Sequence, residues 1–379
     1  MKISPSFLWF RRVNAVSRYP FRNRLHGFAS VAAGPRLPDA PRPPRLRATS
    51  TERSILSATK DIVILVPGRL HPHAVGRIGD RFRLVRIDRA DPALVDPALA
   101  GQVRGMAAMT GIDASFIDAL PKLEIIANFG VGYDAVDARH AAKRGVMVTN
   151  TPDVLTEEVA DTAIGLLINT VRELAKAENY LRAGRWEGEG AYPLTRATLR
   201  GRSVGIFGMG RIGQAIARRI EAFGLPVAYH NRRPVDGVAY AYHDTLKGLA
   251  EAVDTMISVA PGTAATEKAV NAEILAALGP DGVFVNIGRG STVDEADLAA
   301  ALKNGTIRAA GLDVFADEPR VPQALLDVDN ATLLPHVGSA SVHTRQAMAD
   351  LVVDNLVGWF AEGRPISPVP ETEAIARRG

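Results

Sequence analysis

Three ionisable side chains follow short apolar runs in the second half of the chain. Arg289 lies in NIGRGS, Glu318 in GLDVFADEP and His336 in LLPHVGSAS. An arginine fork grips a carboxylate and polarises a neighbouring carbonyl, and a histidine donates a proton to a developing alkoxide. A carboxylate bonded to the other ring nitrogen orients the imidazole and favours its charged form. Together these side-chain types could reduce a 2-oxo acid.

Each of the three residues also has a purely structural interpretation. A strand-end arginine is often a surface charge, Glu318 before a proline is typical of a turn, and His336 after a proline could fill a domain junction. A nucleotide-binding motif in the same half of the chain favours the catalytic interpretation, because ligands of open α/β sheets bind beyond the carboxyl ends of the strands.

The nucleotide-binding motif is VGIFGMGRIG, at residues 204–213. A buried-strand pattern is followed by Gly208, Gly210 and Gly213 at G-x-G-x-x-G spacing, and helical periodicity continues beyond them. The first glycine allows the tight turn, the second lets the backbone approach a pyrophosphate, and the third lets the helix pack on the strand. The helix N-terminus attracts the phosphates. The motif therefore predicts a dinucleotide cofactor.

The end of the next predicted strand indicates which dinucleotide binds. NAD sites usually place an acid there for the ribose 2′-hydroxyl, whereas this chain has Asn231, Arg232 and Arg233, with no acid before Asp236. A guanidinium binds a 2′-phosphate, which a carboxylate would repel. The sequence thus favours NADP(H) over NAD(H). The alternative is that the arginines lie on a solvated surface.

A further segment that could bind substrate, NFGVGYDAVD at residues 128–137, lies in the first half of the chain. Its Gly–Val–Gly turn would leave backbone N–H groups exposed, and such concavities bind anions. The turn could hold a substrate carboxylate opposite Arg289. The alternative is an ordinary strand–helix turn in which Asp134 or Asp137 caps the next helix.

Composition excludes several classes of site. The chain has 379 residues, 47% of them hydrophobic, which is enough for two buried cores. The absence of cysteine excludes disulfides, thiolate nucleophiles and cysteine-ligated metals. The longest apolar stretch, AIGLLINTV, is too short and too polar to cross a bilayer, so we expect no membrane partner. His71 and His73 flank a proline without further ligands, so we also expect no metal.

The positive charge of the chain is concentrated at its N-terminus. Residues 1–50 hold ten lysines or arginines and one acid, so they contribute +9 to a net charge of +4, and the rest carries −5. This distribution argues against a nucleic-acid partner. Richness in arginine and proline predicts a disordered leader over residues 1–54. A transit peptide would make the protein organellar; a disordered extension or a misassigned start would leave it cytoplasmic, as we expect.

From Ile62 onward, short apolar runs alternate with helical stretches, which is typical of parallel β/α units. We therefore predict an α/β fold with two Rossmann-like domains, each built on a parallel sheet. The substrate domain is expected to be discontinuous. The first part of the substrate domain spans residues 55–152, and the nucleotide-binding domain spans residues 153–335. A C-terminal helix within residues 336–370 completes the substrate domain.

Two long helices are expected, one near the start of the nucleotide-binding domain and one near the end of the chain. One runs over residues 156–180, with acids in its first turns as the helix dipole favours. The last runs over residues 341–360. The tail after it, SPVPETEAIARRG, is expected to be frayed.

With these segments assembled, the chain closely resembles the D-isomer-specific 2-hydroxyacid dehydrogenases, and most of all their NADP-dependent glyoxylate/hydroxypyruvate reductase branch. The resemblance runs from about Ile62 to Phe360 and rests on ALPKLEIIANFGVGYDAVD, EVADTAIGLLI, GIFGMGRIG, HNRR, NIGRGS, GLDVFADEP and LLPHVGSAS, in that order. It implies NADPH-dependent reduction of glyoxylate and hydroxypyruvate to D-2-hydroxy acids. It also implies a homodimer formed through the nucleotide domain, with residues 156–201 contributing a long helix and an arm.

The resemblance also implies a role for individual residues. Arg289 would bind the substrate, Glu318 would partner the histidine, and His336 would donate the proton. The other implied contacts are those of Val131 and Gly132 with the substrate carboxylate, of Arg211 and Ile212 with the pyrophosphate, of Asn231, Arg232 and Arg233 with the 2′-phosphate, and of Ile287 and Asp313 with the nicotinamide end. Gly208, Gly210 and Gly213 would form the turn that binds the cofactor.

Other functions remain open on the same scaffold. Aromatic 2-oxo acids such as hydroxyphenylpyruvate are the second choice of substrate. Met106, Met109 and Phe116 are candidates to line the pocket, but flexible methionines leave its size open. NAD-linked D-lactate or phosphoglycerate dehydrogenases are disfavoured by HNRR. A nucleotide-sensing corepressor is a rival of another class, disfavoured by the intact Arg289, Glu318 and His336 set.

Overall fold

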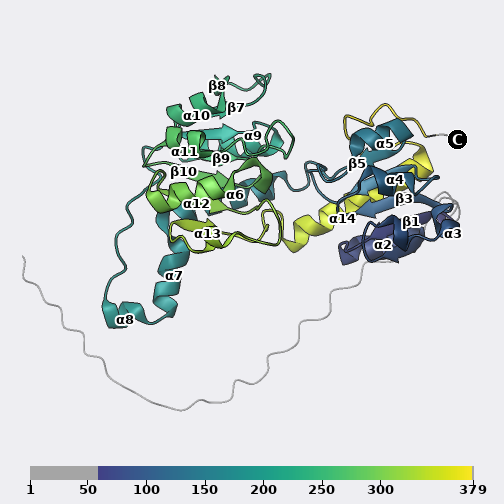
Figure 1. Ribbon diagram of the computed structural model, residues 1–379, viewed down its shortest axis with the longest axis horizontal. Coiled ribbons are helices and arrows are strands. Elements are labelled where there is room, and N and C mark those ends of the chain that lie inside the picture. Colours follow the sequence, from purple (N-terminus) through teal and green to yellow (C-terminus); the bar gives the residue numbers. More distant parts are fainter. Residues whose placement is uncertain (1–58, 378–379) are drawn as a thin grey trace, which may run out of the picture. The chain divides into compact units, whose positions relative to one another are not determined.

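The computed structural model describes residues 59–377, so the leader predicted over residues 1–54 lies outside the described residues. Two parallel β-sheets organise the described chain, which confirms the predicted fold class (Figure 1). In this part of the chain, no helix combines the length and the apolar character that a membrane span requires.

The smaller sheet has five strands in the order β2-β1-β3-β4-β5, and all neighbouring pairs are parallel. The strands are β1 (Val63–Pro67), β2 (Arg83–Ile87), β3 (Val103–Ala108), β4 (Ile125–Asn128) and β5 (Met147–Thr149). They are joined through α2 (Pro72–Arg81), η1 (Pro92–Leu94), α3 (Pro97–Ala100), α4 (Ala114–Asp118) and α5 (Ala138–Arg144). Doubly wound sheets of this order bind ligands where β1 and β3 lie side by side and the strand order reverses.

The larger sheet has seven parallel strands in the order β12-β11-β10-β9-β6-β7-β8. Its strands are β6 (Val204–Phe207), β7 (Val227–His230), β8 (Ala241–His243), β9 (Thr255–Ser258), β10 (Val283–Asn286), β11 (Ala309–Leu312) and β12 (Ala331–Leu333). The sequence did not predict β8. This edge strand has three residues, none of them buried, so it lacks the apolar run that identified the others.

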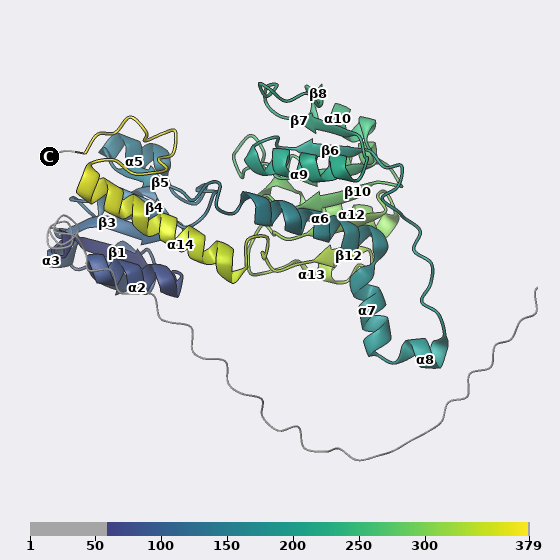
Figure 2. The same cartoon turned by 180° about the vertical axis from the view of Figure 1, so that it is seen from behind.

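Most helices of this half flank the larger sheet. The helices are α6 (Thr156–Arg172), α7 (Leu174–Arg182), α8 (Arg185–Glu189), α9 (Arg211–Ala222), α10 (Leu246–Ala252), α11 (Ala272–Leu278), η2 (Gly290–Thr292), α12 (Glu295–Asn304) and α13 (Gln323–Leu326). Both views show α6 lying along this sheet, whereas α7 and α8 project from it (Figures 1 and 2).

The prediction of a single helix over residues 156–180 is wrong. α6 ends at Arg172, and Glu173 adopts a left-handed conformation, with φ of 52°, before α7 begins. The side chain of Asn169 accepts a hydrogen bond from Ala175 N–H at 2.9 Å. A local side-chain acceptor of this kind competes with the helical carbonyl. No local signal predicts the break, because glutamate has no preference for the left-handed region.

The end of the chain returns to the smaller sheet. α14 (Val342–Val357) continues into the π-helical turn η3 (Gly358–Glu362), so the expected last helix is confirmed. It packs on α2, β3 and β4, although these elements are far away in sequence (Figures 1 and 2). The smaller-sheet half is therefore discontinuous, as predicted.

The tail expected to fray is ordered through residue 377. Val369 is 1% exposed and donates its N–H to Val148 at 3.0 Å. The hydroxyl of Thr372 both accepts from Val148 N–H and donates to Val148 carbonyl, each at 3.1 Å. The tail thus covers the edge strand β5, a long-range pairing that no local periodicity signals.

Candidate active site

The backbone at Arg289 is held by the buried end of β10. Asn286 is 1% exposed; its amide donates to the Arg289 carbonyl at 2.9 Å and accepts from Gly288 N–H at 3.1 Å. A Cβ on Gly290 would lie 1.8 Å from the carbonyl carbon of Phe315, so only glycine permits this approach to the segment after β11. Arg289 is therefore fixed at the carboxyl ends of two neighbouring strands.

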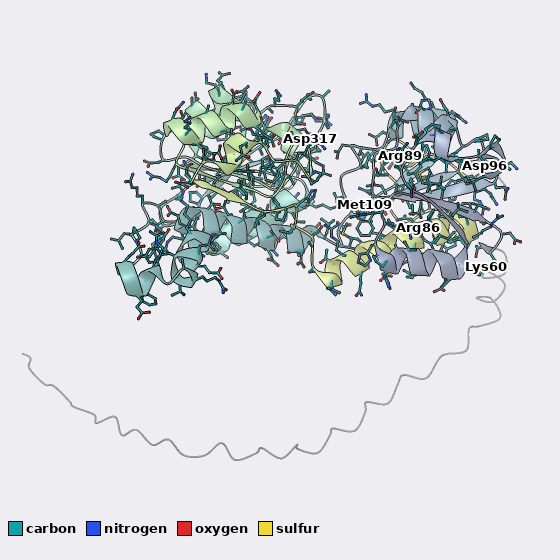
Figure 3. All side chains as sticks on the ribbon, turned by 60° about the horizontal axis from the view of Figure 1, so that its bottom comes forward. Lys60, Arg86, Arg89, Asp96, Met109 and Asp317 are labelled. Carbon is teal, nitrogen blue, oxygen red and sulfur yellow. The ribbon has the colours of Figure 1, made fainter. Side chains whose placement is uncertain are left out.

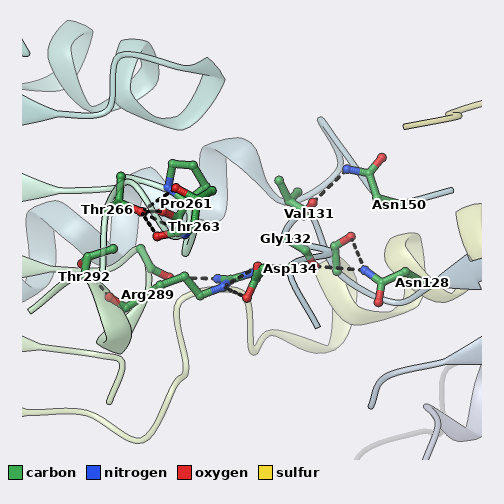
Figure 4. Close-up of polar contacts among 12 residues, drawn as sticks. Asn128, Val131, Gly132, Asp134, Asn150, Pro261, Thr263, Thr266, Arg289 and Thr292 are labelled. Atoms are coloured by element: carbon green, nitrogen blue, oxygen red, sulfur yellow. Dashed lines mark hydrogen bonds and ion pairs between the residues drawn. The ribbon is translucent and has the colours of Figure 1, made fainter. Parts of the chain in front are cut away.

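The guanidinium of Arg289 reaches the first half of the chain (Figure 4). Its Nε donates to both carboxylate oxygens of Asp134, at 3.0 and 3.3 Å, and its Nη1 donates to the Gly288 carbonyl at 2.8 Å. Its Nη2 lies so close to Gly132 that a Cβ there would be 1.4 Å away. The structure thus places Arg289 against the Gly–Val–Gly turn.

Two asparagines shape that turn (Figure 4). Asn128 donates to the carbonyls of Gly130 and Gly132, at 3.2 and 3.0 Å, and Asn150 donates to the Val131 carbonyl at 2.8 Å. Within residues 59–377, the N–H groups of Val131 and Gly132 donate to no partner. Because the carbonyls are tied to side-chain amides, these N–H groups are left for an anion.

Glu318 and His336 form a hydrogen-bonded pair. Glu318 Oε2 lies 2.7 Å from His336 Nδ1, and Glu318 Oε1 accepts from Phe315 N–H at 3.1 Å. Burial raises the pKa of Glu318, but the hydrogen bonds from His336 and Phe315 and the charges of His336 and Arg289 outweigh it, so the pKa lies below its ordinary value. The carboxylate is therefore ionised at neutral pH.

The loop that carries His336 is anchored on Asp313. His336 has a φ of 54°, which is unusual for a residue other than glycine. Its N–H donates to the Asp313 carbonyl at 2.8 Å, and the Asp313 carboxylate accepts from Val337 and Gly338 N–H, both at 2.8 Å. Burial raises the pKa of Asp313 despite these donors. The strained loop is held by these three hydrogen bonds to Asp313, which points to a functional requirement.

The three candidate catalytic residues share one neighbourhood. Gly290 contacts Phe315, whose N–H holds Glu318, and the charge of Arg289 acts on Glu318. The His336 side chain is 46% exposed, and within the described chain no group is hydrogen-bonded to its Nε2. One ring nitrogen is thus held by an acid while the other is available to a ligand.

The glycine turn has the geometry that a dinucleotide needs. Gly208 has a φ of 106°, and a Cβ on Gly213 would lie 2.2 Å from the Gly208 carbonyl, so helix α9 approaches β6 closely. A Cβ on Gly210 would meet no heavy atom within 4 Å, which leaves the turn open. The side chain of Asn231 accepts from Met209 N–H at 2.7 Å and so ties the end of β7 to the turn.

The neighbouring cations are exposed. Arg232 and Arg233 form no ion pair with a described residue, and no acid follows β7 before Asp236. Arg211, expected over the pyrophosphate, pairs its Nε with Asp153 at 3.0 Å; both side chains are about two-thirds exposed. The turn and the free arginines therefore fit a phosphorylated dinucleotide.

For several other predicted residues in the described part of the chain, the structure gives burial or exposure but no contact with the candidate catalytic residues. Ile287 is 7% exposed in the core, and Ile212 packs against the core from α9. Met106 and Phe116, offered as pocket residues, are fully buried in the core of the smaller sheet, so that expectation is wrong for both. Met109 is 47% exposed.

Sequence reasoning missed the partners that position these groups. Asp134 pairs with Arg289, whereas Asp137 caps α5 by accepting from His140 N–H at 2.9 Å. Asn128 and Asn286 end buried strands at 6% and 1% exposure. A buried polar residue at the end of an apolar run was the available signal, because such a side chain needs partners in the following loop.

The chain is similar to known proteins over most of its length. Residues 164–338 match the model of the D-isomer specific 2-hydroxyacid dehydrogenase, NAD binding domain. Glyoxylate/hydroxypyruvate reductase A HPR2 of Arabidopsis thaliana is 47% identical over 262 residues, which cover 69% of this chain and 83% of the relative. Hydroxyphenylpyruvate reductase of Plectranthus scutellarioides is 46% identical over 291 residues, which cover 76% and 91%.

A solved structure agrees with these relatives. The NADPH-dependent glyoxylate/hydroxypyruvate reductase of Sinorhizobium meliloti, in complex with NADP and malonate, is 60% identical with a TM-score of 0.83, and the match covers 84% of this chain and 100% of that chain. The protein is thus an oxidoreductase that uses a nicotinamide cofactor and a small-molecule substrate. The chain belongs to the D-isomer specific 2-hydroxyacid dehydrogenase family.

Proposed function

We propose that this protein reduces small 2-oxo acids, first of all glyoxylate and hydroxypyruvate, to D-2-hydroxy acids with NADPH. The observation that carries the proposal is the Glu318–His336 pair, held beside Arg289 and the open N–H groups of the Gly–Val–Gly turn. The names of the Arabidopsis and Sinorhizobium relatives support this choice of substrates.

In this proposal, the substrate carboxylate binds between the N–H groups of Val131 and Gly132 and the guanidinium of Arg289. Asp134 and the Gly288 carbonyl already hold Nε and Nη1. Nη2 has no hydrogen bond to a described residue, so its N–H groups face the ligand. A fixed guanidinium stabilises the negative charge that develops on the carbonyl oxygen without first reorganising.

His336 supplies the proton. Glu318 holds Nδ1, so Nε2 donates to the carbonyl oxygen as that oxygen becomes a hydroxyl. The ionised carboxylate of Glu318 stabilises the charged imidazole before the transfer. When bound, NADPH supplies the hydride that reduces C2 of the substrate.

The cofactor preference is proposed from the residues after β7. Arg232 and Arg233 are exposed and free of acids, and they would bind the 2′-phosphate. Arg211 would exchange Asp153 for the pyrophosphate, while Ile287 and Asp313 would lie against the nicotinamide end. The Sinorhizobium relative was solved with NADP, which supports the same choice.

Hydroxyphenylpyruvate is the second candidate substrate, because a 46% identical relative carries that activity in its name.

We also propose the domain bounds: residues 55–152 with 336–370 form the substrate domain, and residues 153–335 form the nucleotide domain.

We also propose a homodimer formed through the larger-sheet half. Large apolar side chains are exposed on α7, α8 and the segment after them: Leu174, Leu181, Trp186 and Leu194 are 49%, 53%, 63% and 96% exposed. An apolar patch of this kind marks an interaction surface. Light scattering of the wild type and of Trp186→Ser should give twice the chain mass and the single chain mass; a monomeric wild type would contradict the dimer.

The activity is tested by following NADPH loss with glyoxylate. His336→Ala should lower turnover by roughly 10²-fold or more, as loss of a general acid does, with NADPH affinity unchanged. His343→Ala is the matched control, because His343 is exposed on α14. Arg232→Asp should weaken NADPH far more than NADH. Full turnover of His336→Ala would refute the proton-donor role, and equal effects on both cofactors would refute the NADPH preference.

A further inference from the structure

Arg345 is a half-buried cation that forms no ion pair with an acid of the described chain. It lies in the first turns of α14, and within residues 59–377 its side chain forms no hydrogen bond or ion pair. Its guanidinium carbon lies 5.9 Å from the centre of the Phe129 ring. Burial lowers the pKa of Arg345, and Asp313 is the acid whose charge opposes this. Keeping an arginine partly out of water without an ion pair is costly, and a polar ligand on the guanidinium would offset that cost.

The contacts of Arg345 place it beside the proposed substrate site. Phe129 is 5% exposed and directly precedes the Gly–Val–Gly turn, whose Gly132 touches Arg289. Asp313, which attracts Arg345, also anchors the loop of His336. Arg345 is therefore linked to the anion-binding turn on one side and to the proton donor on the other.

A second ring lies on Phe129. His71 stacks on it with ring centroids 6.1 Å apart and planes 13° apart. Burial and the charges of His73 and Arg345 lower the pKa of His71, so its imidazole is neutral at neutral pH. Nδ1 of His71 accepts from His73 N–H at 3.3 Å, which leaves the other ring nitrogen without a partner among the described residues.

The topology of the smaller sheet brings a further residue to this place. His71 follows β1 and Met109 follows β3, and these strands are neighbours where the strand order reverses. Met109 is 47% exposed (Figure 3). Ligands of doubly wound sheets bind at this reversal, beyond the carboxyl ends of the strands.

We propose that Arg345, with His71 and Met109, forms a subsite for the part of the substrate beyond C2, and that Arg345 binds an oxygen carried on C3. The class of ligand is a 2-oxo acid with a hydrogen-bond-accepting oxygen at C3, hydroxypyruvate being the smallest. The inference rests on the proposed function and deepens it. Arg345 is a specificity-determining residue in this account, whereas Arg289 and His336 act on the carboxylate and the C2 oxygen that all 2-oxo acids share.

Three substrates separate the contribution of Arg345 at C3 from those of Arg289 and His336 at the carboxylate and C2. Glyoxylate has no C3, pyruvate has a C3 methyl, and hydroxypyruvate adds one hydroxyl to pyruvate. The wild type should therefore favour hydroxypyruvate over pyruvate in kcat/KM. A hydrogen bond to a charged group is worth about 1.5–3 kcal/mol, which corresponds to roughly 10-fold to 150-fold.

Arg345→Met is the decisive variant, because methionine keeps an extended apolar side chain against Phe129 and removes the charge. It should lower kcat/KM for hydroxypyruvate by about tenfold or more, while glyoxylate and pyruvate stay near their wild-type values. Arg345→Lys should retain part of the preference, which a merely structural role would not predict. Unchanged glyoxylate turnover shows that each variant is folded.

The outcomes distinguish the two proposals. An equal loss for all three substrates, or an unchanged preference for hydroxypyruvate in Arg345→Met, overturns the subsite and leaves the proposed function standing. If Arg345→Met fails to fold, a wild type without preference for hydroxypyruvate over pyruvate still overturns the subsite. Failure of the wild type to oxidise NADPH with any 2-oxo acid overturns the proposed function and the subsite with it.

Discussion

A single methyl group on Gly132 should disable the proposed substrate arginine. A Cβ at this position would lie 1.4 Å from Arg289 Nη2, 2.5 Å from its Cζ and 2.8 Å from Asp134 Oδ1. The backbone of Gly132 lies outside the left-handed region, so alanine can adopt its conformation. The atoms in the way belong to the ends of side chains. We therefore expect Gly132→Ala to fold normally while Arg289 is pushed aside.

The size of the effect follows from the contacts that Arg289 would lose. Two charge-assisted hydrogen bonds to the substrate at about 1.5 kcal/mol each give about 3 kcal/mol, or roughly 10²-fold in kcat/KM. Gly111→Ala is the matched control, because its Cβ would make only an ordinary contact, at 3.6 Å from the Ala135 carbonyl. Thermal unfolding should show both variants close to the wild type.

A double-mutant cycle identifies the cause. If Gly132→Ala acts through the arginine, adding it to Arg289→Ala should produce no further loss of glyoxylate reduction, because the two changes remove the same interaction. Additive losses would show that the methyl group acts elsewhere. Wild-type kcat/KM in Gly132→Ala would refute the placement of the guanidinium against the turn.

Three further outcomes follow from the structure. Gly213→Ala should destabilise the fold by about 1–3 kcal/mol in chemical denaturation, since its Cβ meets the backbone of Gly208 rather than a mobile side chain; an unchanged midpoint would contradict the close helix–strand approach. Asp134→Ala should reduce kcat/KM with little change in stability, whereas Asp137→Ala should cost about 1 kcal/mol of stability with unchanged kinetics; reversed results would exchange their roles. Glu318 has a lowered pKa, so its contribution to stability should be complete above its ordinary value of 4.5 and disappear as the pH falls through the folded-state pKa. The difference in free energy of unfolding between wild type and Glu318→Gln should therefore become smaller as the pH falls. A difference that grows in acid would contradict the lowered pKa of Glu318.

Local patterns in the sequence were enough for much of the site. Short apolar runs identified every strand except the short edge strand β8. Strands such as β1 and β6 are buried on both faces, so all their residues must be apolar. The spacing of Gly208, Gly210 and Gly213 predicted a turn whose geometry the structure shows. Arg289, Glu318 and His336 were placed at strand ends by the same reasoning, since carboxyl ends of parallel strands meet at one edge.

Only the tertiary structure decided which side chains meet. Asp134 and Asp137 are equivalent candidates for a helix cap in the sequence, yet one caps α5 and the other pairs with Arg289 from the other half of the chain. The exposure of Met109, the burial of Met106 and the contact of Arg345 with Phe129 likewise depend on which elements pack together. Sequence periodicity reports the face that a residue occupies on its own element; partners far away in the chain determine what that face contacts.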